Sequence, residues 1–134
     1  MGKKMMHIGL EAGDVGRYVF LPGSPERTEK IAAYFDNPRE IAYNREYRTF
    51  VGELDGTMVA VTSTGIGGPS AAIAVEELHQ CGADTMMRVG TCASVSPKVS
   101  LGGCGNPQRG SEDGGGEPAL SAGGISFRAG FPDA

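Results

Sequence analysis

Two short segments of the chain carry residue types that bind anions. Residues 63–70 read Ser-Thr-Gly-Ile-Gly-Gly-Pro-Ser, and residues 88–91 read Arg-Val-Gly-Thr. Each segment follows an apolar, strand-like run, and the first also begins a helix-like run. A glycine-rich turn between a strand and a helix brings backbone N–H groups close to an anion. Arg88 and the Thr91 hydroxyl add charge-assisted hydrogen bonds, so the two segments predict a phosphate site.

Three arginines are candidates for the positive charge of this site: Arg27, Arg45 and Arg88. Arg88 lies inside an apolar strand, where a lone guanidinium is costly unless it is paired. A buried ion pair is therefore the alternative role for Arg88. For Arg27 and Arg45 the alternative is a solvated surface charge, and for the glycine run it is a tight turn before a helix.

Other polar groups are weaker candidates. His7, taken alone, is typical of a surface or packing histidine, and Glu76 and Glu77 are predicted to lie on the solvated face of a helix. Neither histidine of the chain lies near a serine or cysteine in a nucleophile motif, so a hydrolase triad is unsupported. The three cysteines are widely spaced and form no C-x-x-C pair, which favours a reduced compartment over a disulfide framework or a zinc site.

Composition limits the class of protein. A chain of 134 residues with a net charge of −4 accommodates one domain and argues against a general nucleic-acid surface. It contains no apolar run of membrane-spanning length, and we expect a cytoplasmic protein without membrane contact. After about Pro97 the composition changes, because residues 98–134 hold ten of the 22 glycines and show no apolar period.

Hydrophobic periodicity indicates which elements position the candidate residues. It predicts strands at Arg17–Leu21, Tyr47–Glu53, Met58–Ser63 and Thr85–Val89, and helices from Pro25 to about Phe35, with Ser24 as N-cap, and from Pro69 to the stop at Gly82. Strands that alternate with helices predict an α/β fold with a parallel or mixed sheet. Ligands bind such sheets at the carboxyl ends of strands, where Gly23, Gly65–Gly68 and Gly90-Thr91 lie.

The combination of motifs is more specific than any one of them. Over residues 5–97 the chain resembles the uridine phosphorylase family, within the nucleoside phosphorylase superfamily, in the segments His7–Leu10, Leu21–Arg27, Asn44–Tyr47, Ser63–Ser70, Glu76–Leu78 and Arg88–Thr91. The resemblance implies the N-terminal part of a three-layer α/β/α sandwich with a mixed sheet. It also implies a hexamer built from dimers, and the reversible phosphorolysis of uridine to uracil and ribose 1-phosphate.

The same resemblance implies roles for individual residues. Gly23, Arg27, Arg88 and Thr91 match the phosphate cradle of one subunit, and Arg45 matches an arginine that reaches into the neighbour's site. His7 matches the residue contributed across the dimer to the ribose 5′-hydroxyl, and Thr91 also faces the ribose. No organic cofactor is implied. A monovalent cation, usually potassium, is implied at the dimer interface, at positions that match Glu46, Ile66 and Ser70.

The tail at residues 102–134 does not continue the resemblance, which leaves residues 1–101 as a truncated domain. Read from the second base of each codon, the stretch that begins at Gly102-Gly103 is able to spell Gly-Asp-Val-Val-Ile-Pro, as a uridine phosphorylase would be expected to continue. One extra G in these codons would produce the printed tail, so we expect residues 102–134 to be out of frame and irregular, without secondary structure. The alternative is a genuine glycine-rich linker.

Three readings of the function follow. The preferred one is a truncated uridine phosphorylase, inactive as written because the half that binds the base and the ribose is missing. A purine nucleoside phosphorylase fragment is the alternative within enzymes, and a nucleosidase of the same superfamily would not need Arg27, Arg45 and Arg88 together. A non-catalytic fragment that binds phosphate or a partner is the alternative from another class.

Overall fold

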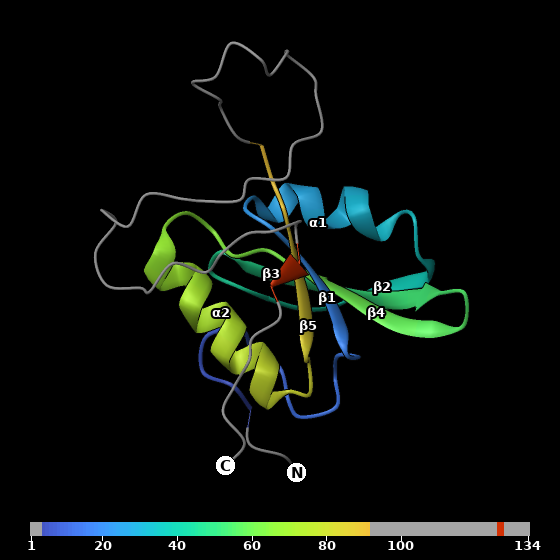
Figure 1. Cartoon of the computed structure of the whole chain (residues 1–134), viewed down its shortest axis with the longest axis horizontal. Helices are drawn as coiled ribbons and strands as arrows, with labels where there is room; N and C mark the ends of the chain where they lie inside the picture. The colour runs from blue at the N-terminus through green and yellow to red at the C-terminus, as the bar shows by residue number, and fades with distance from the viewer. Residues whose placement is uncertain (1–3, 92–125, 128–134) are drawn as a thin grey trace.

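The computed structural model describes residues 4–91 and 126–127 (Figure 1). The elements in chain order are β1 (Tyr18–Pro22), α1 (Pro25–Ala32), β2 (Asp36–Asn44), β3 (Tyr47–Leu54), β4 (Thr57–Thr62), α2 (Gly68–Gln80), β5 (Thr85–Val89) and β6 (Ser126–Phe127). The strands form one sheet in the order β2-β3-β4-β1-β5-β6. Because β1 runs parallel to β4 and β5 while the pairs β2–β3, β3–β4 and β5–β6 are antiparallel, the sheet is mixed, which confirms the predicted α/β class.

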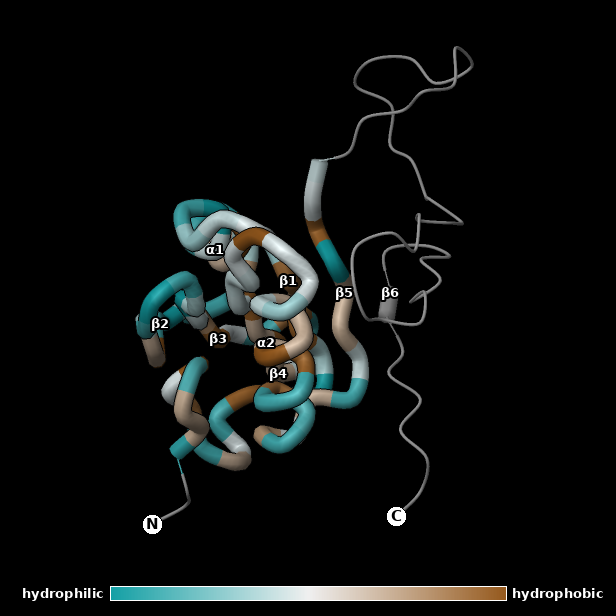
Figure 2. The backbone as a smooth tube through the Cα atoms, turned by 90° about the vertical axis from the view of Figure 1, so that its left-hand side faces the viewer, coloured by the Kyte–Doolittle hydropathy of each residue, from teal (hydrophilic) through white to brown (hydrophobic). Residues whose placement is uncertain are grey.

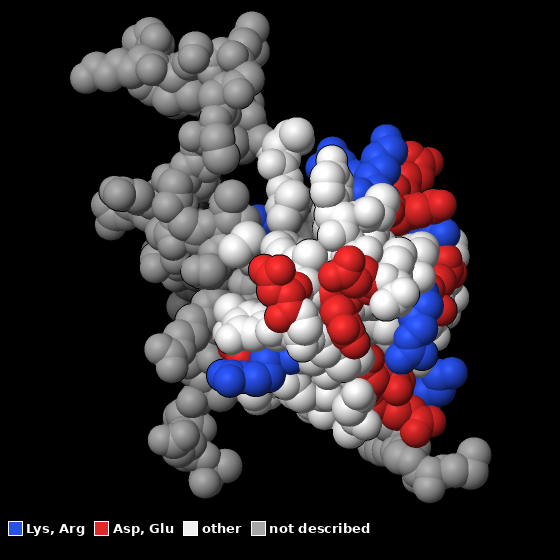
Figure 3. All heavy atoms as spheres, turned by 90° about the vertical axis from the view of Figure 1, so that its right-hand side faces the viewer, with Lys and Arg blue, Asp and Glu red and all other residues white. Residues whose placement is uncertain are grey.

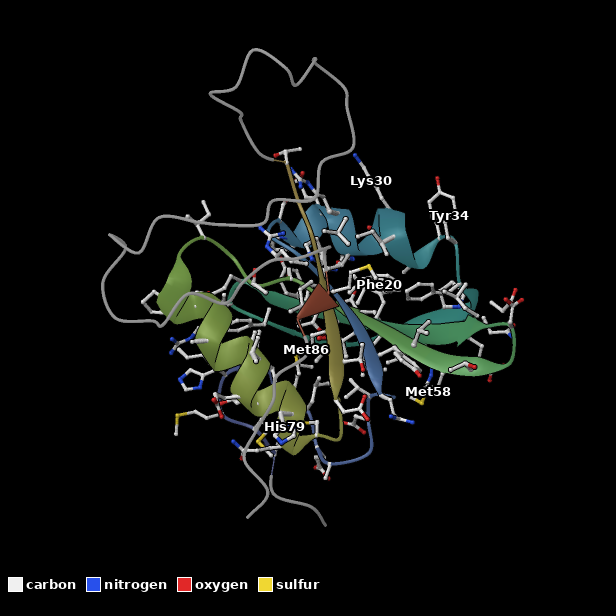
Figure 4. All side chains as sticks on the ribbon, in the orientation of Figure 1. Phe20, Lys30, Tyr34, Met58, His79 and Met86 are labelled. Atoms are coloured by element: carbon white, nitrogen blue, oxygen red, sulfur yellow. The ribbon has the colours of Figure 1, made fainter. Side chains whose placement is uncertain are left out.

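The two helices lie on opposite faces of this sheet (Figure 1). Since side chains of a strand alternate between faces, successive residues belong to different layers. The layer under α2 includes Val19, Leu21, Ala60, Met86 and Leu78. The layer under α1 includes Phe20, Phe35, Phe50, Val59 and Val61. Figure 4 shows Phe20 directly beneath α1 and Met86 on the side of α2, so residues 4–91 form an α/β/α arrangement.

Strand β2 has no counterpart in the sequence prediction. Its segment contains Asn37-Pro38, which is typical of a turn, and it is mostly hydrophilic (Figure 2). The ladder with β3 tolerates these residues because β2 is an edge strand with register shifts between Asp36 and Arg39 and between Glu40 and Ala42. Periodicity therefore missed an element that depends on its ladder with β3 and on the packing of Ile41 and Ala42 against the core.

Helix α1 ends at Ala32, earlier than the predicted end near Phe35. The N–H of Tyr34 donates to the Ile31 carbonyl at 3.1 Å and the N–H of Phe35 to the Ala32 carbonyl at 2.9 Å, bonds that tighten the last turn. Asn37-Pro38 then prevents further helix. Phe35 nevertheless packs on the sheet with Ile31 and Ala32.

The other predicted elements are confirmed to within about two residues. The pair β3–β4 surrounds the turn at Asp55-Gly56, and β5 has the predicted bounds. Helix α2 stops before Gly82, whose φ of 112° suits a glycine. Residues 102–134, predicted to be irregular, lie outside the described residues, with the exception of β6, which pairs with Met86 and Met87.

The surface of the described residues carries charges of both signs. On the face at the right of Figure 1, acidic and basic side chains lie interspersed rather than in separate patches (Figure 3). Such mixing produces no extended field of one sign over that face. Within residues 4–91 and 126–127, no helix is long and apolar enough to cross a membrane.

Candidate functional site

An open pocket of about 630 Å³ lies where the sheet meets the starts of both helices. Its lining includes six residues from the sequence prediction. Gly23, Arg27, Arg88 and Thr91, predicted to bind phosphate, come from the end of β1, the first turn of α1 and the end of β5. Glu46 and Ile66, predicted to hold a cation, come from the turn between β2 and β3 and from the segment before α2. β1 and β5 are parallel and adjacent, so their carboxyl ends meet at one edge of the sheet. The topology thus brings together residues 68 positions apart in the chain, from Gly23 to Thr91.

Arg88 is the most informative side chain of the pocket. Its Nη1 donates to the Leu21 carbonyl at 3.0 Å and to the Val89 carbonyl at 2.7 Å. It forms no ion pair with a carboxylate of the described residues, so the alternative of a buried ion pair is wrong for this part of the chain. Burial, followed by repulsion from Arg27, lowers the pKa of Arg88 below its usual value. An anion in the pocket would offset both effects.

Glycines allow the chain to approach the Arg88 guanidinium closely. A Cβ on Gly23 would lie 3.2 Å from Arg88 Nη2, and a Cβ on Gly90 would lie 2.9 Å from Arg88 Nη1. Gly65 is constrained twice, by a φ of 67° and by Glu46 Cγ, which would lie 2.7 Å from its Cβ. The Gly65 N–H donates to the Gly23 carbonyl at 2.9 Å, which joins the two glycine turns into one pocket wall.

Ser24 contributes to the site in a way the sequence prediction missed. It occupies the N-cap position of α1, but its side chain forms no capping hydrogen bond. Ser24 lines the pocket instead, beside Pro25 at the first position of the helix. Its position next to Gly23 in the predicted turn was the available signal. The start of α2 reaches the same pocket through Gly67, so the positive ends of both helix dipoles lie at its wall.

The residues predicted to hold a cation are brought together only in part. Ser70 Oγ donates to Glu46 Oε1 at 3.0 Å and also to the Thr64 carbonyl. Ile66 is exposed, and because its side chain is a hydrocarbon, its carbonyl oxygen is the candidate ligand. The backbone N–H of Glu46, the Ser70 hydroxyl, and the charges of Arg45 and His7 outweigh burial and lower the pKa of Glu46, which keeps its carboxylate ionised.

His7 lies outside the pocket and is bound by its own chain. Its Nδ1 lies 2.7 Å from Glu77 Oε1, and the backbone N–H groups of His7 and Ile8 donate to the same carboxylate at 3.1 and 2.9 Å. Burial disfavours the charged carboxylate, but the hydrogen bonds from Ile8 and His7 prevail, so the pKa of Glu77 is lowered. With a side chain only 12% exposed, Glu77 is not on a solvated face, and that prediction is wrong.

Arg45 also lies outside the residues that line the pocket. It is an exposed residue in the turn between β2 and β3, where its φ of 54° is unusual for a residue with a side chain. Asn44 Nδ2 donates to the His7 carbonyl at 2.7 Å, so the segment of His7 and the turn of Arg45 are tied together. The predicted site residues therefore fall into two groups: the pocket residues together with Ser70, which bonds to Glu46 of the lining, and His7 and Arg45, which lie outside it.

Comparison with known proteins matches this chain to phosphorylases, by a family model and by individual relatives. A family model described as the phosphorylase superfamily matches residues 17–104, more than half of the chain. Uridine phosphorylase from Thermococcus kodakarensis is 55% identical over 96 residues, which cover 72% of this chain and 35% of that protein. Guanosine phosphorylase from Halorubrum lacusprofundi is 43% identical over 99 residues, which cover 74% of this chain and 41% of that protein.

Solved structures agree with the sequence relatives. Uridine phosphorylase from Vibrio fischeri superimposes with a TM-score of 0.64 at 46% identity, over 66% of this chain and 37% of that chain. Purine nucleoside phosphorylase from Toxoplasma gondii, in complex with immucillin-H, superimposes with a TM-score of 0.69 at 43% identity, over 74% of this chain and 40% of that chain. The chain thus spans about two fifths or less of the length of these relatives. By its fold and its sequence, this chain belongs to the phosphorylase superfamily.

Proposed function

We propose that residues 4–91 form the phosphate-binding part of a nucleoside phosphorylase, a pentosyltransferase that acts on uridine. One observation carries the proposal. Arg27 and Arg88 line the same pocket as the glycine turns, and neither pairs with a carboxylate of the described residues. Positive charge that the fold leaves unpaired at helix N-termini is what a bound phosphate requires.

The chemistry needs no protein nucleophile. A phosphate oxygen forms a bond to the anomeric carbon of the ribose, and the glycosidic C–N bond breaks with its electron pair passing to the base. Arg27, Arg88 and the Thr91 hydroxyl hold the phosphate beside the carbon where positive charge develops, while Thr91 also faces the ribose. Positioning and electrostatic stabilisation supply the rate enhancement.

The second group of residues completes a neighbouring site in this proposal. Arg45 and His7 lie outside their own chain's pocket, so a second copy of the chain must receive them, Arg45 at the phosphate and His7 at the ribose 5′-hydroxyl. A homo-oligomer, a hexamer built from dimers, is the assembly we propose. Its mass is measured by sedimentation equilibrium, and a monomer at all concentrations would contradict shared sites.

A potassium ion is the proposed ligand of the Glu46 carboxylate, the Ser70 hydroxyl and the Ile66 carbonyl. The donor set fits in kind, because these are oxygen ligands and the Glu46 carboxylate is ionised. These three groups supply only part of the coordination shell of a potassium ion, so a second copy of the chain would provide the further oxygens. The ion would hold two subunits together and takes no part in bond breaking.

We further propose that the 134-residue chain by itself does not release uracil. It spans 35–40% of the uridine phosphorylases to which it is similar, and residues 102–134 would be an out-of-frame tail after a domain at 1–101. Losing contacts made in the transition state costs a factor of ten in rate for each ~1.4 kcal/mol. A non-catalytic fragment that binds phosphate is then what remains.

The test compares two chains: the 134-residue chain, and the chain encoded after one G is removed from the Gly102-Gly103 codons. Uracil release from uridine is measured with and without phosphate. We expect phosphate-dependent release from the corrected chain alone. Turnover by the 134-residue chain would contradict the proposed inactivity, early stop codons in the corrected frame would contradict the frameshift, and release without phosphate would indicate a nucleosidase.

A purine nucleoside is the second candidate substrate. Relatives named guanosine phosphorylase and purine nucleoside phosphorylase match the same part of the chain at 43% identity. Since the described pocket is a phosphate site in either case, the two candidates differ only in the base. Parallel assays of the corrected chain with uridine, inosine and guanosine decide between them.

A further inference from the structure

The turn that carries Arg45 is held in an unusual conformation. Asn44 and Tyr47 pair across the end of the β2–β3 ladder, which leaves Arg45 and Glu46 as the two residues of the turn. Arg45 has a φ of 54°, in a region that residues with side chains rarely adopt. Such a conformation persists only where the surrounding structure holds it, and strain of this kind gathers at functional sites. The contacts that hold the turn are therefore informative.

Ser63, the first residue after β4, supplies the principal contact. Its side chain is fully buried, and its hydroxyl donates to the Glu46 carbonyl at 2.5 Å while it accepts the Arg48 N–H at 2.8 Å. The Ser63 N–H in turn donates to the Arg48 carbonyl at 3.1 Å. The Ser63 hydroxyl thus acts as both donor and acceptor, and it holds the turn between β2 and β3 from the end of β4.

The strands on either side of the turn are anchored separately. Arg48 pairs with Glu40 at 2.7 Å, and its guanidinium lies 5.4 Å from the centre of the Tyr43 ring, so the two strands are joined just below the turn. Asn44 is fastened to the N-terminal segment through the His7 carbonyl at 2.7 Å. Arg45 itself forms no ion pair with the described residues and is exposed.

We propose that Ser63 is a positioning residue for Arg45. By fixing the Glu46 carbonyl, the Ser63 hydroxyl holds Arg45 in its left-handed conformation and presents the guanidinium outward from a rigid backbone. A preorganised arginine loses less conformational freedom when it binds an anion. This inference rests on the proposed function in one respect, since the anion is the phosphate held by a second copy of the chain.

The matched variants are Ser63→Ala and Thr49→Val in the full chain. Thr49 Oγ1 lies 3.0 Å from Thr62 Oγ1, so Thr49→Val removes a buried hydroxyl from the same pair of strands without touching the turn. We measure backbone amide exchange at Arg48 and ¹⁵N order parameters at Arg45 and Glu46. Ser63→Ala should speed exchange of the Arg48 amide at least tenfold and lower the order parameter of Arg45, and Thr49→Val should leave the order of the turn unchanged.

A second variant keeps the test decisive if Ser63→Ala does not fold. Ser63→Cys is close in size and retains a weak donor, so the order of Arg45 should fall between those of the unaltered chain and the alanine variant. Unchanged order at Arg45 in the variant that folds would overturn the proposal. An equal loss of order in Thr49→Val would overturn it too, because it would indicate general loosening of the sheet.

Titration with inorganic phosphate separates this inference from the proposed function. Ser63→Ala should weaken phosphate binding about threefold or more, and should have no further effect in a chain that already carries Arg45→Ala. If Ser63→Ala weakens phosphate binding equally in chains with and without Arg45→Ala, Ser63 does not act through Arg45 and the proposal is overturned. If the unaltered chain binds no phosphate, the proposed function fails, while the order parameters still decide whether Ser63 holds the turn.

Discussion

The pocket and the outer hairpin of β2 and β3 surround their arginines in opposite ways. In the hairpin, Arg48 contacts Glu40 at 2.7 Å and Glu29 at 3.3 Å, and its guanidinium lies 4.9 Å from the centre of the Phe50 ring. The hydrogen bonds that Arg48 donates to Glu40 raise the pKa of Arg48 above its usual value. In the pocket, the hydrogen bonds that Arg88 donates within the described residues go to backbone carbonyls, and burial lowers its pKa.

The difference separates Arg48, whose charge is neutralised within the fold, from Arg88, whose charge is available to an anion. A guanidinium has five N–H donors, and three nitrogens of Arg48 donate to the carboxylates of Glu40 and Glu29, which also neutralise its charge. At Arg88 only Nη1 has protein partners among the described residues, and no carboxylate neutralises the charge. Arg48 therefore stabilises the fold, whereas Arg88 retains both the charge and the donors that an anion needs.

The largest expected effect comes from Arg88→Ala. We expect phosphate binding, measured by calorimetry at fixed ionic strength, to weaken at least tenfold, because hydrogen bonds to charged groups contribute about 1.5–3 kcal/mol each. Arg39→Ala, which removes an exposed arginine of the hairpin that takes no part in holding the Arg45 turn, is the matched control and should leave phosphate affinity unchanged. Equal weakening in the two variants would erase the distinction between the pocket and the hairpin.

Gly65→Ala tests whether the pocket depends on close backbone approach. The added methyl would meet Glu46 Cγ at 2.7 Å and Ser70 Oγ at 3.1 Å, at a φ of 67°. We expect the free energy of unfolding in urea to fall by about 1–3 kcal/mol, with loss of phosphate binding. Gly68→Ala is the control, since its Cβ would have no neighbour within 4 Å. A tolerated Gly65→Ala would show that the wall of the pocket is adjustable.

Helix α2 carries the same contrast in its carboxylates. Glu77 is bound by His7 and Ile8, whereas its neighbour Glu76 is exposed. Because the pKa of Glu77 is lowered in the fold, its contribution to stability is present above its unfolded pKa of about 4.3 and is lost as the pH falls through the folded pKa.

Glu77→Gln should therefore reduce the stability of the chain near neutral pH and make the free energy of unfolding fall less steeply below pH ~4.3. Urea unfolding at several pH values measures both effects. The profile of Glu76→Gln should follow that of the unaltered chain. Superimposable profiles for the two variants would mean that the contacts to His7 and Ile8 contribute nothing.

The smallest expected effect is that of Arg48→Met on stability. Glu29 and Glu40 are partly exposed, and surface ion pairs and cation–π contacts contribute up to about 1 kcal/mol each. We expect a loss of about 1 kcal/mol in urea unfolding, with the Arg39→Met variant of the neighbouring strand β2 losing less than half of that. A larger loss in Arg39→Met would remove the structural role assigned to Arg48.

Most of the fold was predictable from the sequence. Strands β1, β3, β4 and β5 and both helices follow from apolar periodicity and from proline and glycine at their ends. Strand β2 was not predictable, because Asn37-Pro38 indicates a turn and the strand depends on its ladder with β3 and on contacts of Ile41 and Asn44 with distant segments. The early end of α1 likewise depends on how Phe35 docks on the sheet.

The candidate site divides along the same line. The sequence by itself determined that glycine turns and the arginines Arg27 and Arg88 stand near the ends of elements, because turn chemistry and apolar periodicity are local properties. Only the tertiary structure decided that Arg88 lacks a carboxylate partner among the described residues, that Glu77 is bound rather than solvated, and that Ser63 fastens the turn of Arg45. Each of these depends on which distant groups the sheet brings within hydrogen-bond distance, and residue spacing along the chain carries no such information.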